Sequence, residues 1–240
     1  MVGASIFSFL NVIIYRVPRK LDFVKVRSFC PGCEHNLNFL DMIPVFGWIF
    51  LGGKCRYCKE KISPRYMFIE TLGGMLALLV VYLYGFSLKA VLCFALFAVL
   101  TIIAFVDIDT MKIPNGFIAA LLVVSVISIF VFTGLPWYER LIGCVAASGI
   151  LLIITMIAPG AFGGGDIKMM AACGIMLGWK MSLMALFLAI LFGGLYGIVL
   201  LLRKKTGRKC HFAFGPFLCI GVAVAFIWGE QILSTYLSLQ

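Results

Sequence analysis

The sequence predicts an all-α polytopic membrane protein with about eight transmembrane helices and a cytoplasmic zinc-binding loop. Of its 240 residues 63% are hydrophobic and only 12% are charged, and the mean hydropathy is +1.11. Several apolar runs approach or reach the roughly 17–25 residues that a helix needs to cross a bilayer. A soluble domain of this size does not need so much apolar surface, and a transmembrane barrel would show short alternating segments instead.

Eight apolar segments are the expected helices. The first has no basic residue before its apolar core and is followed by Arg16, Arg19 and Lys20. This order is the reverse of a signal peptide, so we expect an anchor with its N-terminus outside. One segment, 167–179, is short and is expected to cross only in part. The full set is 1–15, 66–84, 90–106, 117–133, 141–159, 167–179, 181–202 and 213–236.

The placement of basic residues sets the expected orientation. With the N-terminus outside, 17 of the 20 Lys and Arg residues fall in cytoplasmic loops, and Lys89, Arg140 and Lys180 fall in outer loops. Basic residues gather on the cytoplasmic side of membrane proteins. The net charge of +10 therefore reflects topology first and attraction to anionic lipids second; nucleic-acid binding is a poor explanation for it.

The long loop 16–65 contains two Cys-x-x-Cys pairs. Cys30 and Cys33 form the first, and Cys55 and Cys58 form the second. This spacing is close to that of a tetrathiolate zinc site, and four sulfurs leave no open position, which favours a structural ion. Disulfides, redox thiols, an iron–sulfur centre or another metal remain as alternatives.

Other residues of the loop have plainer interpretations. His35 is interpreted as a surface histidine rather than a ligand. The stretch Leu37–Leu51, with Pro44 and Trp48, is too short and too broken to span, so we expect it on the membrane surface or packed on the bundle. The five remaining cysteines are interpreted as small packing residues: Cys93, Cys144, Cys173, Cys210 and Cys219.

Two aspartates stand where a membrane chain should avoid them. Asp107 ends an apolar run, and Asp166 closes the run Gly163-Gly164-Gly165 before another apolar segment. A carboxylate in the bilayer costs roughly 2.5–3.5 kcal/mol on insertion scales. Asp109 lies two residues from Asp107, so the two do not share a helical face, and we expect only one of them to enter the bundle.

Each aspartate taken alone has an ordinary interpretation. Asp107 can be a loop-end acid beside Lys112, and Asp166 can be the acid at a helix start, where it suits the dipole. Together they lie on the same predicted side of a bundle with few other acids. Close carboxylates share a proton, and such a pair can activate water and polarise a carbonyl. The pair therefore favours aspartic peptide hydrolysis.

These residues resemble a known family, the type IV prepilin peptidases (leader peptidase/N-methyltransferases) among the intramembrane aspartyl proteases. Gly163-Gly164-Gly165-Asp166 resembles their Gly-x-Gly-Asp motif, and Asp107 followed by Ile113-Pro114-Asn115 resembles their first active-site motif. The stretch 5–18, the doubled Cys-x-x-Cys loop, Asp41-Met42-Ile43-Pro44 and Glu70 are also similar. Asn115 departs from the family, in which many members have Asp after the proline.

The resemblance implies an enzyme of the bacterial inner membrane. It would cleave the basic leader of prepilins or pseudopilins after a glycine, at the cytoplasmic face, with Asp107 and Asp166 as the catalytic pair. It would then methylate the new N-terminus with S-adenosylmethionine, although no nucleotide-binding glycine motif is visible. The implied parts are the anchor 1–15, the loop domain 16–65, associated with methyl transfer, and the peptidase domain 66–240.

Two functions of other classes remain open at this point. The first is an ion- or proton-coupled transporter that uses Asp107 and Asp166 as ion sites. The second is a membrane scaffold whose zinc loop docks an assembly ATPase. The acids Glu34, Asp41, Glu60 and Glu70 are candidates for local contact with a basic leader. The sequence does not indicate an oligomeric state.

Overall fold

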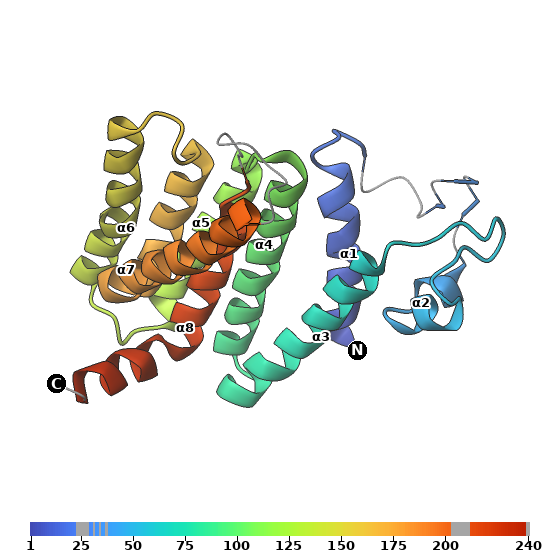
Figure 1. The fold of residues 1–240 in the computed structure, drawn as a ribbon. Helices are drawn as coiled ribbons and strands as arrows, with labels where there is room; N and C mark the ends of the chain where they lie inside the picture. The colour runs from blue at the N-terminus through green and yellow to red at the C-terminus, as the bar shows by residue number, and fades with distance from the viewer. Residues whose placement is uncertain (23–28, 31, 34, 37, 203–211, 239–240) are drawn as a thin grey trace. The chain divides into compact units, whose positions relative to one another are not determined.

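The computed structural model describes residues 1–22, 29, 30, 32, 33, 35, 36, 38–202 and 212–238. Within these ranges the regular structure is helical, apart from two isolated β-bridges. The chain divides into two compact units, Met1–Phe94 and Ala95–Gln240 (Figure 1). The fold is therefore all-α, as expected.

Unit 1 is built around the pairing of α1 (Val2–Arg16) with α3 (Pro64–Tyr84). Glycines let the two helices approach closely. A Cβ on Gly3 would meet the side chain of Ala77 at 2.5 Å, and a Cβ on Gly73 would overlap the ring of Phe7. Small residues at such contacts are the usual basis of helix packing in membranes, because the gain comes from close van der Waals contact.

The ends of α3 follow from its local sequence. Ser63 accepts a hydrogen bond from the backbone N–H of Arg65, and Pro64 occupies the first helical position, where its missing N–H costs nothing. Gly85 ends the helix with φ +63°, a conformation that favours glycine. The following helix, α4 (Leu88–Thr110), begins in unit 1 and continues into unit 2.

The described part of the stretch, 38–51, forms two short helices, η1 (Phe39–Met42) and α2 (Phe46–Phe50). Val45, with φ +66°, precedes α2 and donates its backbone N–H to Glu70 Oε2 of α3 at 2.7 Å. Trp48 Nε1 donates to the carbonyl of Ile62 at 3.2 Å. These bonds tie α2 to the beginning of α3, so the stretch does not span.

Unit 2 is organised around the long helix α7 (Gly164–Leu202), which packs against α5 (Asn115–Val131), α6 (Trp137–Ile157) and α8 (Gly215–Ser238). The backbones of α6 and α7 touch at Gly143 and Gly174, where a Cβ on either would overlap the carbonyl of the other. Gly221 of α8 approaches the Ala185 carbonyl of α7 in the same way.

Helix α7 is broken at Gly178, whose φ of 72° and ψ of 175° are not helical. A Cβ there would lie 2.9 Å from a methyl group of Leu135. Figure 1 shows the two parts of α7 running in different directions. The expected segments 167–179 and 181–202 therefore correspond to two helices within α7 that meet at Gly178 without a loop between them.

The prediction of eight transmembrane helices is confirmed only in part. Five helices are long and apolar enough to cross a membrane: Pro64–Tyr84, Leu88–Thr110, Trp137–Ile157, Gly164–Leu200 and Gly215–Tyr236. Two further apolar helices, Val2–Arg16 and Asn115–Val131, are shorter. The predicted segments 167–179 and 181–202 both lie within α7, which counts as a single candidate span. The number of candidate spans differs from the predicted eight because capping residues set the length of each helix, and non-helical residues such as Gly178 set where a helix is interrupted.

The position of Arg140 differs from the predicted outer loop. It was assigned to an outer loop, but it lies in the first turn of α6 and is only 3% exposed. Its guanidinium donates to the carbonyls of Leu135, Phe132 and Ile175 and to Ser128 Oγ. Several of these acceptors lie at the C-terminal end of α5, whose last carbonyls lack partners within the helix. A buried cation thus joins α5, α6 and α7.

Replacing Arg140 with Met should therefore destabilise the protein strongly. The change keeps the length of the side chain but leaves several buried acceptors unpaired, at about 1–3 kcal/mol for each. We expect a clearly lower melting temperature in detergent, measured by intrinsic fluorescence. Lys180→Met, at an exposed position of α7, is the matched control and should melt like the unmodified protein. Equal melting temperatures for both variants would contradict this role of Arg140.

Candidate active site and metal centre

Asp107 lies in the last turn of α4 and is only 5% exposed. Its Oδ2 accepts the backbone N–H of Gly215 at 2.9 Å. Gly215 is the first residue of α8, so its N–H is one of the helix donors with no intrahelical acceptor. A Cβ on Gly215 would lie 2.6 Å from Asp107 Oδ2. Glycine is therefore required for the carboxylate to reach this donor.

Asp166 lies in the first turn of α7 and is 7% exposed. Its Oδ2 accepts the backbone N–H of Gly163 at 3.1 Å, while its own N–H donates to the Gly163 carbonyl at 3.0 Å. The first of these bonds is one half of a capping box, in which the side chain of the third helical residue accepts the N–H of the capping residue; Gly163 has no side chain to supply the other half. The expected close approach of the glycine run occurs at Gly165, where a Cβ would lie 2.9 Å from Ile113 Cβ. The chain turns at Gly160, with φ +87°.

The structure brings the two predicted aspartates together within unit 2. They lie close enough for the charge of Asp107 to act on Asp166. Neither forms an ion pair with a cation of the described residues. Two carboxylates that are buried close together without a cation cannot both ionise easily. Asp109 is exposed, so only one member of the Asp107–Asp109 pair enters the bundle.

Gly215 and two aromatic residues were missed by sequence reasoning. Phe162 precedes Gly163, and Phe214 precedes Gly215. Their ring centroids are 4.9 Å apart, so the two turns that hold the carboxylates are in contact through their side chains. The Gly-Pro pair at 215–216, at the start of the last apolar segment, was the only local signal of a special turn.

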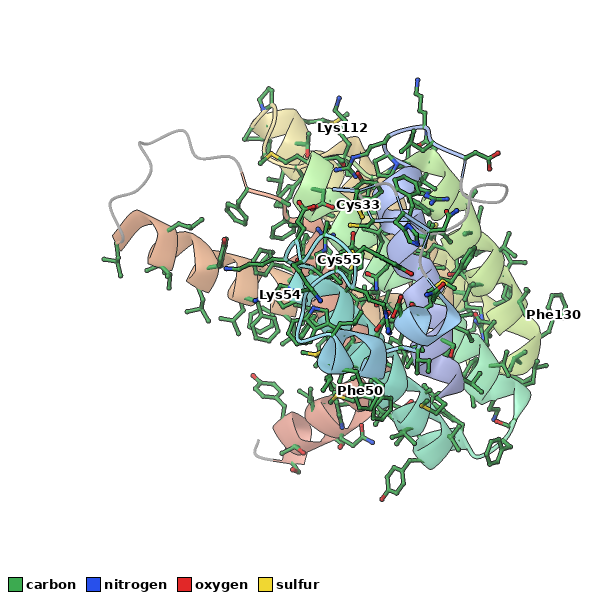
Figure 2. The ribbon with its side chains drawn as sticks, turned by 90° about the vertical axis from the view of Figure 1, so that its right-hand side faces the viewer. Cys33, Phe50, Lys54, Cys55, Lys112 and Phe130 are labelled. Carbon is green, nitrogen blue, oxygen red and sulfur yellow. The ribbon has the colours of Figure 1, made fainter. Side chains whose placement is uncertain are left out.

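A second candidate site lies in unit 1, where the four predicted cysteines converge. The sulfurs of Cys30, Cys33, Cys55 and Cys58 all lie within 4.8 Å of one another. Figure 2 shows Cys33 and Cys55, one from each pair, side by side, and their sulfurs are 4.0 Å apart. The sulfurs of Cys30 and Cys58 are 3.7 Å apart.

The two cysteine pairs sit in matching turns. In the first, Phe29 forms a β-bridge with Asn36, and the Cys30 N–H donates to the His35 carbonyl at 3.0 Å. The second repeats this pattern 25 residues later, with the bridge from Lys54 to Lys61 and the Cys55 N–H donating to the Glu60 carbonyl at 2.8 Å. Each turn thus presents two sulfurs to a common centre.

The geometry of the four sulfurs fits zinc. Four thiolates about 2.3 Å from a tetrahedral zinc ion lie about 3.8 Å from one another, which matches the separations above. All four cysteines are free thiols. Backbone N–H groups of Cys58 and Tyr57 lower the pKa of Cys55 to about 7. The turn therefore favours the thiolate form of Cys55, the form in which cysteine binds a metal.

Three of the loop acids that are candidates for leader contact have local contacts within the chain. Asp41 forms an ion pair with Arg56 at 2.6 Å, and Glu70 accepts the Val45 N–H. The Glu60 carboxylate lies against Gly32, where a Cβ would overlap it. Glu34 lies outside the described residues.

The other cysteines and His35 behave as plain packing residues where they are described. His35 stacks on Tyr57 with ring centroids 3.7 Å apart. Three of the remaining cysteines are buried in helices and a fourth is half-buried: Cys93, Cys173, Cys219 and Cys144. Cys210 lies outside the described residues.

Comparisons with known proteins identify the family of the chain. Residues 1–84 match the family model of the bacterial peptidase A24 N-terminal domain, and residues 94–198 match that of the type IV leader peptidase family. No solved structure matches the chain.

Several relatives carry the name prepilin leader peptidase/N-methyltransferase. The protein from Bacillus subtilis (strain 168) is 32% identical over 99% of this chain and 96% of its own length. Those from Aeromonas salmonicida (strain A449) and Legionella pneumophila are each 30% identical, over 99% of this chain and 92% of their own lengths. The resemblance suggested by the two aspartate motifs is thus confirmed along the whole sequence, and the chain belongs to the type IV leader peptidase family.

Proposed function

We propose that this membrane peptidase cleaves the basic leader of type IV prepilins or pseudopilins, with Asp107 and Asp166 activating the attacking water. The single observation that carries the proposal is the buried pair of carboxylates in unit 2, each held by a backbone N–H. The relatives named prepilin leader peptidase/N-methyltransferase support the choice of substrate.

The mechanism follows from one proton shared by two carboxylates. The ionised aspartate takes a proton from water while the protonated one donates its proton to the scissile carbonyl oxygen, as the new C–O bond forms. The tetrahedral intermediate then collapses with the carbon–nitrogen bond breaking. The leaving amine receives the proton that was taken from water, and the gem-diol proton returns to the second carboxylate. Gly215 and Gly163 hold one oxygen of each aspartate throughout, which leaves the other oxygens for water and substrate.

The same pair was considered as an ion site of a transporter. The comparisons give that alternative no support, because the family and its named relatives are peptidases. The scaffold interpretation would leave two buried carboxylates at an energetic cost with no function to offset it.

For the membrane arrangement we propose eight crossings with the N-terminus outside and the aspartates at the cytoplasmic face. The two helices of α7, divided at Gly178, count as separate crossings in this arrangement. Lys112 follows α4 directly, and Lys168 Nζ donates to Asn115 Oδ1 at the start of α5, at 3.2 Å. Basic residues thus gather near the carboxylates, as expected on a cytoplasmic side. The bacterial origin of the named relatives supports the further proposal that the enzyme lies in the inner membrane of a bacterium.

In unit 1 we propose that Cys30, Cys33, Cys55 and Cys58 hold a structural zinc ion. A closed set of four thiolates has no position for water or substrate, so the ion would stabilise the loop and take no part in hydrolysis. A division of the chain by function into 1–15, 16–65 and 66–240 remains a prediction, distinct from the two compact units.

Methylation of the new N-terminus is a further part of the proposal, since the relatives are named N-methyltransferases. A cavity of about 380 Å³ in unit 1 is lined by Lys54 and Lys61 and by no acidic residue. S-adenosylmethionine carries a net positive charge, so two lysines oppose its binding. The cavity does not fit this cofactor, and no residue is assigned to it.

The first test replaces each aspartate in turn. Asp107→Asn and Asp166→Asn should each lower cleavage of a co-expressed prepilin by at least about a hundredfold, because each removes a proton acceptor. The intact mass of the substrate is the readout, and it also reveals an added methyl group. Asp109→Asn, at an exposed position, is the matched control and should be mild. Full cleavage by either of the first two variants would exclude the carboxylate pair.

A second test addresses the turn that holds Asp107. Gly215→Ala should displace the carboxylate and lower kcat by up to about a hundredfold, as expected for a misplaced catalytic group, while KM changes little. Gly194→Ala in α7, where a Cβ meets no atom within 4 Å, should leave both constants unchanged. If Gly215→Ala cleaves normally while folded, this hydrogen bond is not needed.

The zinc proposal predicts bound metal in the purified protein. Elemental analysis should find one zinc ion per chain. Cys30→Ser and Cys55→Ser should each remove it and lower abundance and melting temperature before they affect peptide chemistry, since the site stabilises the loop. Cys144→Ser, outside the cluster, should keep the metal. A metal-free protein with normal stability would rule out a structural ion.

A further inference from the structure

The short helix α2 presents apolar side chains that nothing in its own unit covers. Three of the five residues of α2 are exposed: Phe46 is 45% exposed, Ile49 52% and Phe50 81%. Phe46 and Phe50 stack with ring centroids 6.2 Å apart. Figure 2 labels Phe50, the last residue of α2, and Lys54, which follows it four residues later. Three large exposed apolar residues on one turn mark a contact with something apolar.

The position of α2 along α3 indicates the level at which this contact occurs. Helix α3 is a candidate membrane span that begins at Pro64. The hydrogen bond from the Val45 N–H to Glu70 ties the start of α2 to a residue of α3 that lies six positions after Pro64, roughly 9 Å along the helix axis. Interfacial helices bury their apolar face about 5–10 Å into the boundary between headgroups and acyl chains. The apolar face of α2 therefore lies at that depth.

A cavity that Trp48 of α2 helps to line combines apolar and basic side chains, as the headgroup region of an anionic lipid would need. Its apolar wall is formed by Trp48, Ile62 and Pro64, and its polar groups come from Lys54, Lys61 and Ser63. Ser63 and Pro64 are the cap and first residue of α3, so the cavity lies at the end of the spanning helix. This is where the phosphates of lipids are found.

Lys54 and Lys61 face each other across an antiparallel β-bridge. Like charges at opposite positions of a bridge destabilise it, and neither lysine forms an ion pair within the part of the chain that the structure describes. A single phosphate between them would neutralise this repulsion. The pair of lysines thus favours an anion, and the apolar wall favours an anion that carries hydrocarbon.

We propose that α2 and the Lys54–Lys61 cavity form a binding site for an anionic phospholipid of the membrane surface. The phosphate lies between the two lysines, and the glycerol and upper acyl chain contact Trp48 and Ile62, which line the cavity. The lipid anchors the loop next to the zinc centre against the membrane. This site is independent of peptide cleavage, so its test does not depend on the proposed substrate.

The test uses the full-length protein with the photoreactive residue p-benzoylphenylalanine in place of Ile62, which lines the cavity. The protein is reconstituted in nanodiscs of phosphatidylcholine with a minor fraction of phosphatidylglycerol, irradiated, and its intact mass is measured. We expect phospholipid adducts in which phosphatidylglycerol exceeds its share of the bilayer by about fivefold for each lysine that contacts it. The double variant Lys54→Gln, Lys61→Gln should bring that excess back to the bilayer share.

Lys59→Gln is the matched control, because Lys59 is exposed in the same hairpin but does not line the cavity; it should keep the excess. The zinc content of every variant is measured, so that loss of the excess cannot be assigned to a disrupted metal centre. Adducts with protein segments or a second copy of the chain would overturn the proposal. So would lipid adducts without an excess of phosphatidylglycerol, or an excess that persists in the double variant.

Discussion

Two buried carboxylates held only by backbone N–H groups are the constraint on which unit 2 depends. Asp107 and Asp166 come from helices far apart in sequence, and each is anchored by a glycine at the start of a helix or just before one. A side-chain cation would have fixed both charges and left no shared proton. Backbone donors instead hold one oxygen of each aspartate without neutralising the pair. The turns at 163 and 215 must therefore sit side by side, and the contact of Phe162 with Phe214 keeps them there.

The rest of the bundle can be understood as the support of those turns. Helix α7 carries Asp166 at its start and packs on α5, α6 and α8 along its length. The glycine contacts at Gly143, Gly174 and Gly221 bring helix backbones together where lipid provides no hydrophobic driving force between helices. Arg140 fastens α5, α6 and the first part of α7 by filling carbonyls that would otherwise be unpaired. A rigid frame of this kind is what a catalytic pair needs, because small displacements of reacting groups are costly.

Unit 1 solves a different problem. Its loop is too short and too polar to build a hydrophobic core of its own, so a cluster of four sulfurs takes the place of such a core. The two matching turns give the loop its internal order, and the bond from Val45 to Glu70 attaches the intervening helix to α3. In the zinc-bound form proposed above, the binding energy of the metal stabilises the folded loop.

The sequence by itself determined the class of the protein and the chemistry of its two sites. Hydropathy located each apolar helix, cysteine spacing predicted the four-sulfur cluster, and the two aspartate motifs indicated a peptidase family that the comparisons confirm. These features are local, and local patterns are what a sequence expresses directly. The sequence could also narrow the choice between Asp107 and Asp109, because their spacing forbids a common face.

Only the tertiary structure decided which distant groups meet. The approach of Gly215 to Asp107 joins residues 108 positions apart, and no local pattern specifies such a contact. The burial of Arg140 was missed for the same reason, because its acceptors lie on three different segments. The bend at Gly178 depends on Leu135 occupying the space beside it. Each of these features is fixed by packing between segments, which is decided only when the whole bundle has formed.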